Sequence, residues 1–111
     1  MTYAEHVVIL ATHAYTARIL ELLSDDEYRL LQQAPVARPD AGRLIRRTGG
    51  LRKLRWAAKG RGKRGGARIV YYRHVPRDRL LMLLAYAKGE QDDLTPRQRA
   101  VLRKIVETEY P

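Results

Sequence analysis

Two different spacings of apolar residues follow one another in the first third of the chain. Residues Val7–Leu10 form a short apolar run rich in β-branched residues, which is typical of a strand buried on both faces. From Tyr15 onward apolar residues recur at helical intervals, and Ser24–Glu27 has the sequence of a capping box that ends one helix and starts another. Proline disfavours helical dihedrals in the preceding residue, so Pro35 and Pro39 predict that the second helix does not continue far.

Strand-like segments dominate the rest of the chain. Three of them are separated by glycine-rich breaks: Arg43–Thr48, Arg52–Ala57 and Ala67–Val75. A tight turn at Pro76 leads into Leu80–Tyr86, an almost wholly apolar run that predicts a central strand buried on both faces. Thr95, Pro96 and Gln98 then supply the N-cap, the first-turn proline and the capping-box partner of a last helix.

The resulting order, β-α-α-β-β-β-β-α, predicts an α+β fold. Helices are expected to pack on one face of a mostly antiparallel sheet and to leave the other face free. The 111 residues suit a single domain spanning 1–111. Alternation along a strand directs Leu54 and Trp56 toward the helices, so Lys53 and Arg55 should lie on the open face.

Further cations are expected on that open face. On the neighbouring strand Ile69 and Tyr71 make the better core pair, which places Arg68 on the same face as the two cations of the preceding strand. Lys88 follows the apolar strand closely enough to reach the same surface. We therefore expect three or four cations to converge on one concave patch.

Positive charge is concentrated in the same region. Between Arg43 and Arg79 lie 14 of the 22 Lys/Arg residues and a single acid, Asp78, whereas the rest of the chain carries 8 basic and 11 acidic residues. A net charge of +13 over 37 residues needs a polyanionic partner, and the apolar residues among the cations distinguish the segment from a disordered basic tail. The segment is interpreted as a cationic face built on a sheet.

The composition also bears on the compartment. Cysteine is absent, which excludes a disulfide framework and a thiolate metal site. No apolar run approaches the ~20 residues needed to span a bilayer, and the first residues lack the cationic start of a signal peptide. We expect a cytosolic protein with no membrane partner.

Four segments together resemble the RelE/ParE superfamily of bacterial toxins and are most similar to its HigB-like members: Gly50–Trp56, Lys59–Gly66, Ala67–Tyr72 and Leu83–Glu90. The resemblance implies a RelE-like toxin that is encoded with a cognate antitoxin and cleaves messenger RNA in the ribosomal decoding site. The implied partners are therefore the antitoxin, the ribosome with its ribosomal RNA, and messenger RNA. Carried over to this chain, the basic catalytic positions of the family fall on Lys53, Arg55, Arg68 and Lys88.

Such residues can support RNA cleavage with no metal ion or other cofactor. The 2′-hydroxyl of the RNA attacks the adjacent phosphate, so the protein must stabilise charge on the phosphorus centre and transfer protons. The planar fork of an arginine matches phosphate oxygens, which makes Arg68 the expected phosphate clamp with Arg55 in support. Either Lys53 or Lys88 is expected to transfer the protons.

Other side chains have both a functional and a structural interpretation. Cations in and before the glycine-rich loop are expected to hold ribosomal RNA phosphates, or to be solvated without a docking role: Lys59, Arg61, Lys63, Arg64, Arg43, Arg46 and Arg47. Tyr72 either stacks on an RNA base or packs within the sheet. We expect His74 to be solvated at a strand end beside Pro76, and Asp92 and Asp93 to be loop acids near a helix N-terminus and not metal ligands.

Three functions stay open at the level of the sequence. The first hypothesis is a ribosome-dependent endoribonuclease, an mRNA interferase, that inhibits translation. A ParE-like toxin that targets gyrase shares the fold, although the grouping of Lys53, Arg55 and Arg68 fits an RNA phosphate site better. The third is a basic RNA-binding module without catalysis.

Overall fold

The computed structural model describes residues 8–56, 66–91 and 93–109. Its elements follow the order β1 (Val8–Ala11), α1 (His13–Leu22), α2 (Asp25–Ala37), β2 (Arg43–Leu44), β3 (Arg52–Trp56), β4 (Ala67–His74), the short 3-10 helix η2 (Val75–Arg77), β5 (Arg79–Ala87) and α4 (Pro96–Glu109). This order confirms the predicted succession of strands and helices in an α+β fold. None of the helices in the described ranges has an apolar stretch long enough to cross a bilayer.

A single five-stranded sheet has the order β1-β5-β4-β3-β2. β1 pairs with β5 in parallel and the other neighbours pair antiparallel, which confirms a mostly antiparallel sheet. β5 is buried along most of its length, as predicted, although β4 and not β5 is the middle strand. The prediction of a first strand buried on both faces is wrong. Among the described strands only β5 flanks β1, so Val8, Ile9 and Leu10 are exposed at the edge of the sheet.

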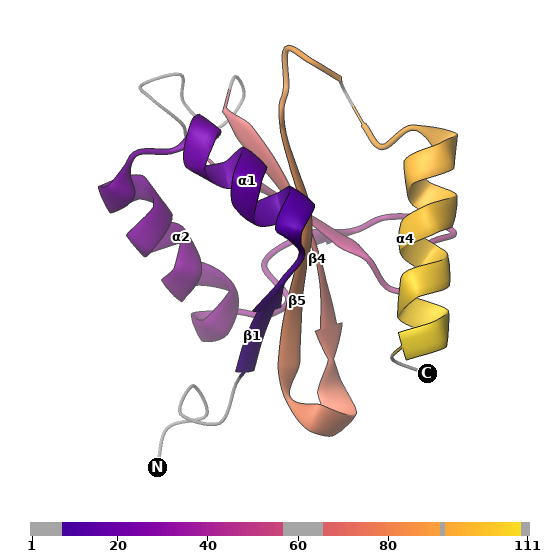
Figure 1. The fold of residues 1–111 in the computed structure, drawn as a ribbon. Helices are drawn as coiled ribbons and strands as arrows, with labels where there is room; N and C mark the ends of the chain where they lie inside the picture. Colours follow the sequence, from indigo (N-terminus) through magenta and orange to yellow (C-terminus); the bar gives the residue numbers. More distant parts are fainter. Residues whose placement is uncertain (1–7, 57–65, 92, 110–111) are drawn as a thin grey trace.

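Helices cover both faces of the sheet (Figure 1). α1 and α2 lie on one face, where Ile19 and Leu31 belong to the same apolar cluster as Ile69 and Tyr71. α4 lies on the other face, and its buried residues pack in a second cluster with Val70, Leu81, Leu83, Leu102 and Val106 as members. The prediction that the helices leave one face free is therefore wrong for α4. Both faces of β4 and β5 present apolar side chains, and the second face needs its own cover.

One extra residue interrupts the pairing of β4 with β5. Val70 pairs with Leu84 whereas Tyr71 pairs with Met82, so Leu83 has no partner in the ladder and forms a bulge on β5. The alternation of side chains along β5 is shifted by one position at this point.

The shift is visible in the two apolar clusters. Before the bulge, Leu80 and Met82 belong to the cluster beneath α1 and α2, whereas after it Ala85 and Ala87 do. Tyr86 consequently lies in the cluster on the α4 face. The bulge thus decides which residues at the end of β5 share a face with the cations of β3 and β4.

The bulge also positions the start of α1. The hydroxyl of Thr12 donates a hydrogen bond of 2.7 Å to the carbonyl oxygen of Leu83, and its oxygen accepts the N–H of Tyr15 at 3.0 Å. Thr12 is therefore the N-cap of α1 and its link to β5.

Both predicted capping boxes are present. The hydroxyl of Ser24 accepts the N–H of Glu27, whose side chain accepts the N–H of Ser24. Thr95 and Gln98 exchange the same two bonds, at 3.1 and 3.0 Å, at the start of α4. These local signals fix where both helices begin.

α2 extends farther than its prolines predict. The helix continues through Pro35 to Ala37, and the N–H of Arg38 closes its last turn on the carbonyl oxygen of Ala34. Because Pro35 lies in the last turn, its missing N–H removes only one hydrogen bond. Its ring is fully buried, which offsets part of that loss.

The segment Arg43–Thr48, predicted to be one strand, becomes a turn after β2. The N–H of Ile45 still bonds Leu51, but the hydroxyl of Thr48 then donates to the carbonyl of Ile45 at 2.6 Å and accepts the N–H of Leu51. Arg47 has a φ of 60°, in the left-handed region. This buried threonine stabilises a turn that ends the strand pairing.

A buried tyrosine fixes the chain that leads into β2. The hydroxyl of Tyr71 accepts the N–H of Gly42 at 2.9 Å and donates to the carbonyl of Pro39 at 2.8 Å. Burial raises the pKa of Tyr71, outweighing the lowering effects of the hydrogen bond from Gly42 and of nearby Arg52. The phenol is thus protonated near neutral pH and available as a donor.

Candidate functional site

The strand register places two arginines side by side on the α4 face of the sheet. Arg55 of β3 pairs directly with Arg68 of β4, which pairs on its other side with Tyr86 of β5. Directly opposed residues in antiparallel strands share a face, so the three side chains form a row across the sheet. The predicted grouping of Arg55 with Arg68 is confirmed. Tyr86 was not expected in this row.

Lys53 extends the basic surface along β3. It pairs with Val70 on one side and with Arg43 of β2 on the other, which confirms that it shares the face of Arg55. A hollow of about 300 Å³ opens here, lined by the cations Arg43, Lys53 and Arg55 together with Ala41 and Leu54. We call Arg43, Lys53, Arg55 and Arg68 the strand site.

The two arginines of the row differ in exposure. Arg55 is exposed, whereas Arg68 is only 4% exposed and donates a 3.4 Å hydrogen bond from Nη1 to the carbonyl of Ala67. Arginine keeps its charge in proteins, and an interaction between charges is stronger where water is excluded. The burial of Arg68 therefore favours strong binding of a phosphate that reaches it.

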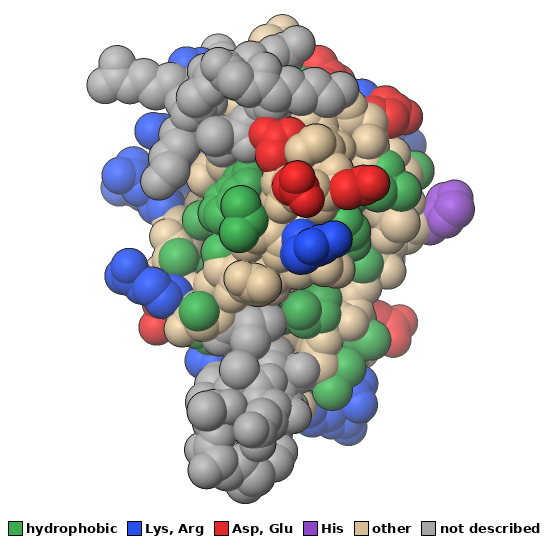
Figure 2. Space-filling model, turned by 90° about the vertical axis from the view of Figure 1, so that its left-hand side faces the viewer, with side chains coloured by type: hydrophobic (Ala, Val, Ile, Leu, Met, Phe, Trp, Pro, Cys, Tyr) green, Lys and Arg blue, Asp and Glu red, His purple; other side chains and the backbone are tan. Residues whose placement is uncertain are grey.

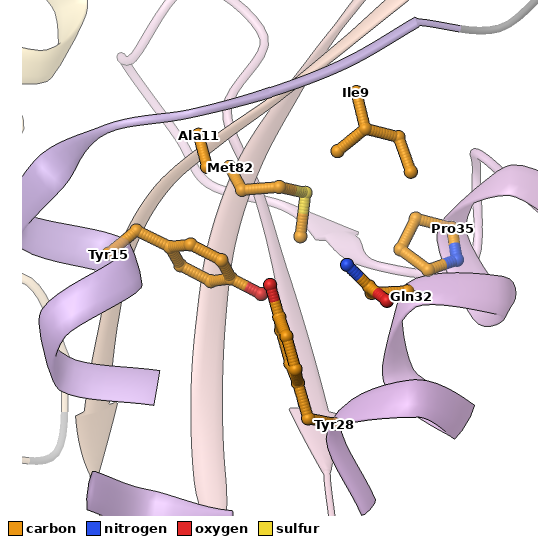
Figure 3. A pocket seen from close by; sticks show the side chains of 7 residues that line it. All are labelled: Ile9, Ala11, Tyr15, Tyr28, Gln32, Pro35 and Met82. Carbon is orange, nitrogen blue, oxygen red and sulfur yellow. The ribbon is translucent and has the colours of Figure 1, made fainter. Parts of the chain in front are cut away.

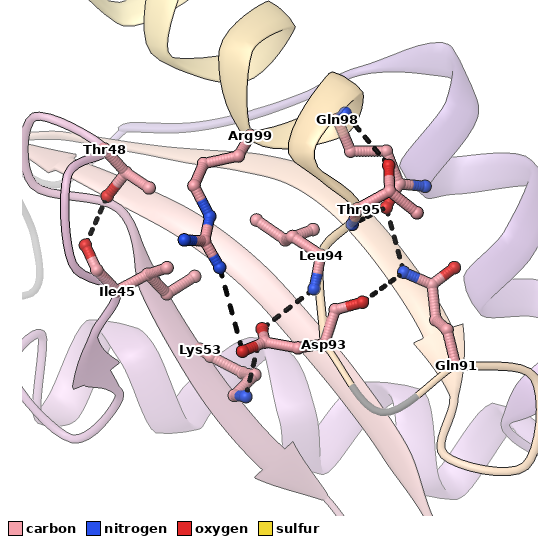
Figure 4. A network of polar contacts seen from close by, with 9 residues as sticks. All are labelled: Ile45, Thr48, Lys53, Gln91, Asp93, Leu94, Thr95, Gln98 and Arg99. Carbon is pink, nitrogen blue, oxygen red and sulfur yellow. Dashed lines mark hydrogen bonds and ion pairs between the residues drawn. The ribbon is translucent and has the colours of Figure 1, made fainter.

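A carboxylate from the loop before α4 holds Lys53 (Figure 4). Oδ1 of Asp93 lies 3.3 Å from Nζ of Lys53, and Oδ2 lies 3.8 Å from Nη2 of Arg99. The same carboxylate accepts the N–H of Leu94 at 2.8 Å, and Gln91 donates to the backbone carbonyl of Asp93. Asp93 thereby connects the strand site to α4.

The surroundings of Asp93 change its acidity. Burial by itself raises the pKa, but the hydrogen bond from Leu94 and the charges of Lys53 and Arg99 outweigh it, so the pKa of Asp93 is lowered from its ordinary value of 3.8. The carboxylate is therefore ionised at all pH values near neutrality, and it partly neutralises Lys53.

No group of three or more His, Cys, Asp or Glu side chains within the described ranges is arranged to hold a metal ion. The family described as the RelE toxin of the RelE / RelB toxin-antitoxin system matches residues 25–110. The chain belongs to the RelE toxin family.

Membership in the RelE family makes the protein a toxin of a toxin-antitoxin system and implies an antitoxin as its partner. The match extends from the start of α2 to the end of α4 and so includes every residue of the strand site.

Lys88 directly follows the end of β5 in this RelE-family protein. Its N–H bonds the carbonyl of Gly66 at 3.2 Å, which continues the ladder between β4 and β5 by one step. Its side chain is exposed in the turn that follows β5, two positions after Tyr86. It thus lies near Arg68, as predicted, although no described contact joins the two side chains.

The remaining predicted residues are farther from the row or outside the described chain. Arg46 and Arg47 are exposed in the turn after β2. Tyr72 is half-buried against the α4-side cluster, and its stacking role stays a prediction. The loop cations Lys59, Arg61, Lys63 and Arg64 lie outside the described residues.

His74 is not solvated, contrary to the prediction. It is 5% exposed, and its ring centroid lies 6.3 Å from that of Tyr72. His74 is the last residue of β4 and still pairs with Arg79 of β5, so it is held within the sheet. It lies six positions from Arg68 along the strand, roughly 20 Å at ~3.3 Å per residue, so it is not part of the strand site.

The side of the molecule formed by α1 and α2 differs from the strand site in its charge. On the side of α1 and α2 the acidic side chains gather together, and Lys and Arg lie mainly toward the margins (Figure 2). A cavity of about 260 Å³ between β1, α1 and α2 contains no cation, and the hydroxyls of Tyr15 and Tyr28 meet within it (Figure 3). Burial, reinforced by Tyr28, raises the pKa of Tyr15. With no cation in its lining, this cavity is not suited to phosphate.

Asp93→Asn should lower the free energy of unfolding at pH 7 but have little effect near pH 2. Because folding lowers the pKa of Asp93, its stabilising contribution is complete above the ordinary value of 3.8 and is lost as the pH falls through the lower value of the folded state. The side chain is half exposed, so we expect a difference of about 0.5 to 1 kcal/mol at pH 7. Urea unfolding at both pH values measures it, and an equal difference at both would contradict this account.

Proposed function

We propose that this RelE-family toxin is a ribosome-dependent endoribonuclease that cleaves messenger RNA during translation and so inhibits protein synthesis. The observation that carries the proposal is the direct pairing of Arg55 with the buried Arg68 beside Lys53. Together with the family match, this cluster supports a site for an RNA phosphate. The grouping of these cations fits an RNA phosphate site better than it fits a gyrase-directed activity.

The RNA supplies the attacking 2′-hydroxyl, and side chains of this protein supply the charge stabilisation and the proton transfers. The 2′-oxygen of the RNA forms a bond to the adjacent phosphorus and the bond from phosphorus to the 5′-oxygen breaks, which leaves a 2′,3′-cyclic phosphate and a 5′-hydroxyl. One proton leaves the 2′-hydroxyl and one reaches the 5′-oxygen. Arg68 is proposed to bind the non-bridging oxygens as negative charge develops, and Arg55 to approach from the exposed side.

Two lysines are available for the proton transfers. Lys53 is held by Asp93, whereas Lys88 is exposed at the end of β5. Either can reach an RNA strand that crosses the row. The ribosome would supply much of the rate by holding the strand in line, since positioning alone can contribute about 7 to 11 kcal/mol.

The proposal is tested with purified ribosomes that translate a defined messenger. Addition of the protein should produce new RNA ends within translated codons, mapped by primer extension, and no ends when ribosomes are omitted. Cleavage of naked messenger at the same rate would contradict ribosome dependence. Intact messenger together with DNA breaks in cells would instead favour a gyrase toxin, and intact messenger without DNA breaks a non-catalytic RNA-binding module.

A further inference from the structure

A second basic hollow lies on the outer side of α4. It has a volume of about 640 Å³, and four cations and one acid are among the residues that line it: Arg47, Arg99, Arg103, Lys104 and Glu107. Three of the basic residues of α4 line the hollow: Arg99 and Arg103 lie four positions apart on one side of the helix, and Lys104 follows Arg103 at the edge of that side. The apolar residues of α4 face the sheet from another side.

Contacts hold the turn after β2 against the helix. Nη1 of Arg103 donates to the backbone carbonyl of Arg47 at 3.4 Å, and its Nε donates to Glu107 at 2.8 Å. Arg103 is nevertheless half exposed. The hollow is therefore formed by two segments that are distant in the sequence and joined by a cation that can still reach a ligand.

Arg99 connects the hollow to the strand site. Its Nη2 lies 3.8 Å from the carboxylate of Asp93, which also contacts Lys53. Its Nε is buried and donates no hydrogen bond to any described residue. One carboxylate thus lies between the two basic surfaces, and a polyanion that leaves the strand site past Asp93 arrives at α4.

We propose that the residues Arg47, Arg99, Arg103 and Lys104 bind backbone phosphates of an RNA strand as it continues from the strand site. The arginine forks match phosphate oxygens. A protein partner would need large exposed apolar or aromatic anchors, whereas the uncharged lining residues are a buried leucine, a proline and an alanine: Leu94, Pro96 and Ala100. The identity of the polyanion as RNA rests on the proposed function.

The test measures the salt dependence of RNA binding. The probe is a fluorescein-labelled 20-nucleotide 2′-O-methyl RNA, which cannot be cleaved because its 2′-oxygens are blocked. The double variant R103Q/K104Q should lower the slope of log K against log salt by about 1.4, since each lost phosphate contact to a single strand changes it by about 0.7. Glutamine has nearly the helix propensity of arginine and lysine, so α4 should be retained. Circular dichroism and thermal unfolding check this.

The matched control is R29Q/R77Q. It also removes two positive charges, but from exposed positions on α2 and η2 that lie away from the hollow. Its slope should equal that of the wild type. Equal slopes for all three proteins, or equal losses in both variants, overturn the proposal.

The rival occupant is an acidic segment of the antitoxin. If R103Q/K104Q binds the RNA normally but binds the antitoxin more weakly, the surface belongs to that protein and our assignment is wrong. The result is separable from the proposed function. A slope change in a protein that cleaves no messenger would support the phosphate site and refute the nuclease, whereas normal cleavage with no slope change would refute the phosphate site alone.

Discussion

Replacing Arg68 by lysine should lower ribosome-dependent messenger cleavage about 10²- to 10³-fold, the cost typical of removing one donor that stabilises charge in a transition state. Lysine retains the positive charge but not the planar pair of N–H groups that fits two phosphate oxygens. The loss should appear in the rate at saturating ribosomes and not only in apparent affinity, because the contact is proposed to strengthen as charge develops on the phosphate. Single-turnover cleavage of ribosome-bound messenger measures it.

The matched control for this substitution is Arg73→Lys on the same strand. Arg73 pairs with Asp78 at the other end of β4, 3.3 Å away, and lies outside the strand site. Arg73→Lys should therefore cleave at the rate of the wild type. Because Arg68 is buried, thermal unfolding of Arg68→Lys must show a folded protein at the assay temperature. A folded Arg68→Lys protein with full activity would remove Arg68 from the mechanism.

Gly42→Ala should destabilise the fold by about 1 to 3 kcal/mol, the usual cost of overpacking a buried site. A Cβ at this position would lie 2.7 Å from Cε1 of Tyr71, 2.8 Å from its hydroxyl oxygen and 3.1 Å from Cβ of Arg52. The ring cannot withdraw easily, since Tyr71 is fully buried and its hydroxyl bonds both Gly42 and Pro39. Urea unfolding should show a lower midpoint with an unchanged slope.

Gly89→Ala is the corresponding control for stability. A Cβ at Gly89 would have no neighbour within 4 Å, so the same methyl group should change the free energy of unfolding by less than about 0.5 kcal/mol. Equal stability of the two variants would show that the chain before β2 moves aside freely. The link between Tyr71 and that segment would then contribute little.

The arrangement of the strand site could be predicted from the sequence because it depends on a period of two. Leu54 and Trp56 require one face of β3, which leaves Lys53 and Arg55 on the other, and the same argument places Arg68. The capping boxes at Ser24 and Thr95 were equally predictable, since each depends on residues three positions apart.

Other features depend on contacts that no local pattern contains. Asp93 lies 40 positions from Lys53 in the sequence. No local pattern around this loop acid predicts that its carboxylate contacts both Lys53 and Arg99. The burial of Arg68 likewise follows from the packing of several segments. The cover over the second face could have been anticipated, because Val70, Leu81 and Leu83 are apolar residues that needed burial by a helix such as α4.

Tyr86 was missed for a more specific reason. It was counted within the apolar run Leu80–Tyr86, whose sequence does not predict the bulge that shifts the alternation at Leu83. With uninterrupted alternation, Leu80 and Met82 on the helix side would place Tyr86 on that side as well.

The bulge on β5 makes the length of that strand part of the site. Deleting one residue after the bulge, between Leu84 and Tyr86, would turn Tyr86 toward α1 and α2 while Arg55 and Arg68 kept their places, so the row would lose Tyr86 without any substitution in it. During divergence of such toxins, substitutions within β5 need only preserve packing, but a single insertion or deletion between the bulge and Tyr86 must be matched by a second to restore the phase. The spacing between the bulge and Tyr86 is therefore a constraint on sequence length, independent of which residues occupy it.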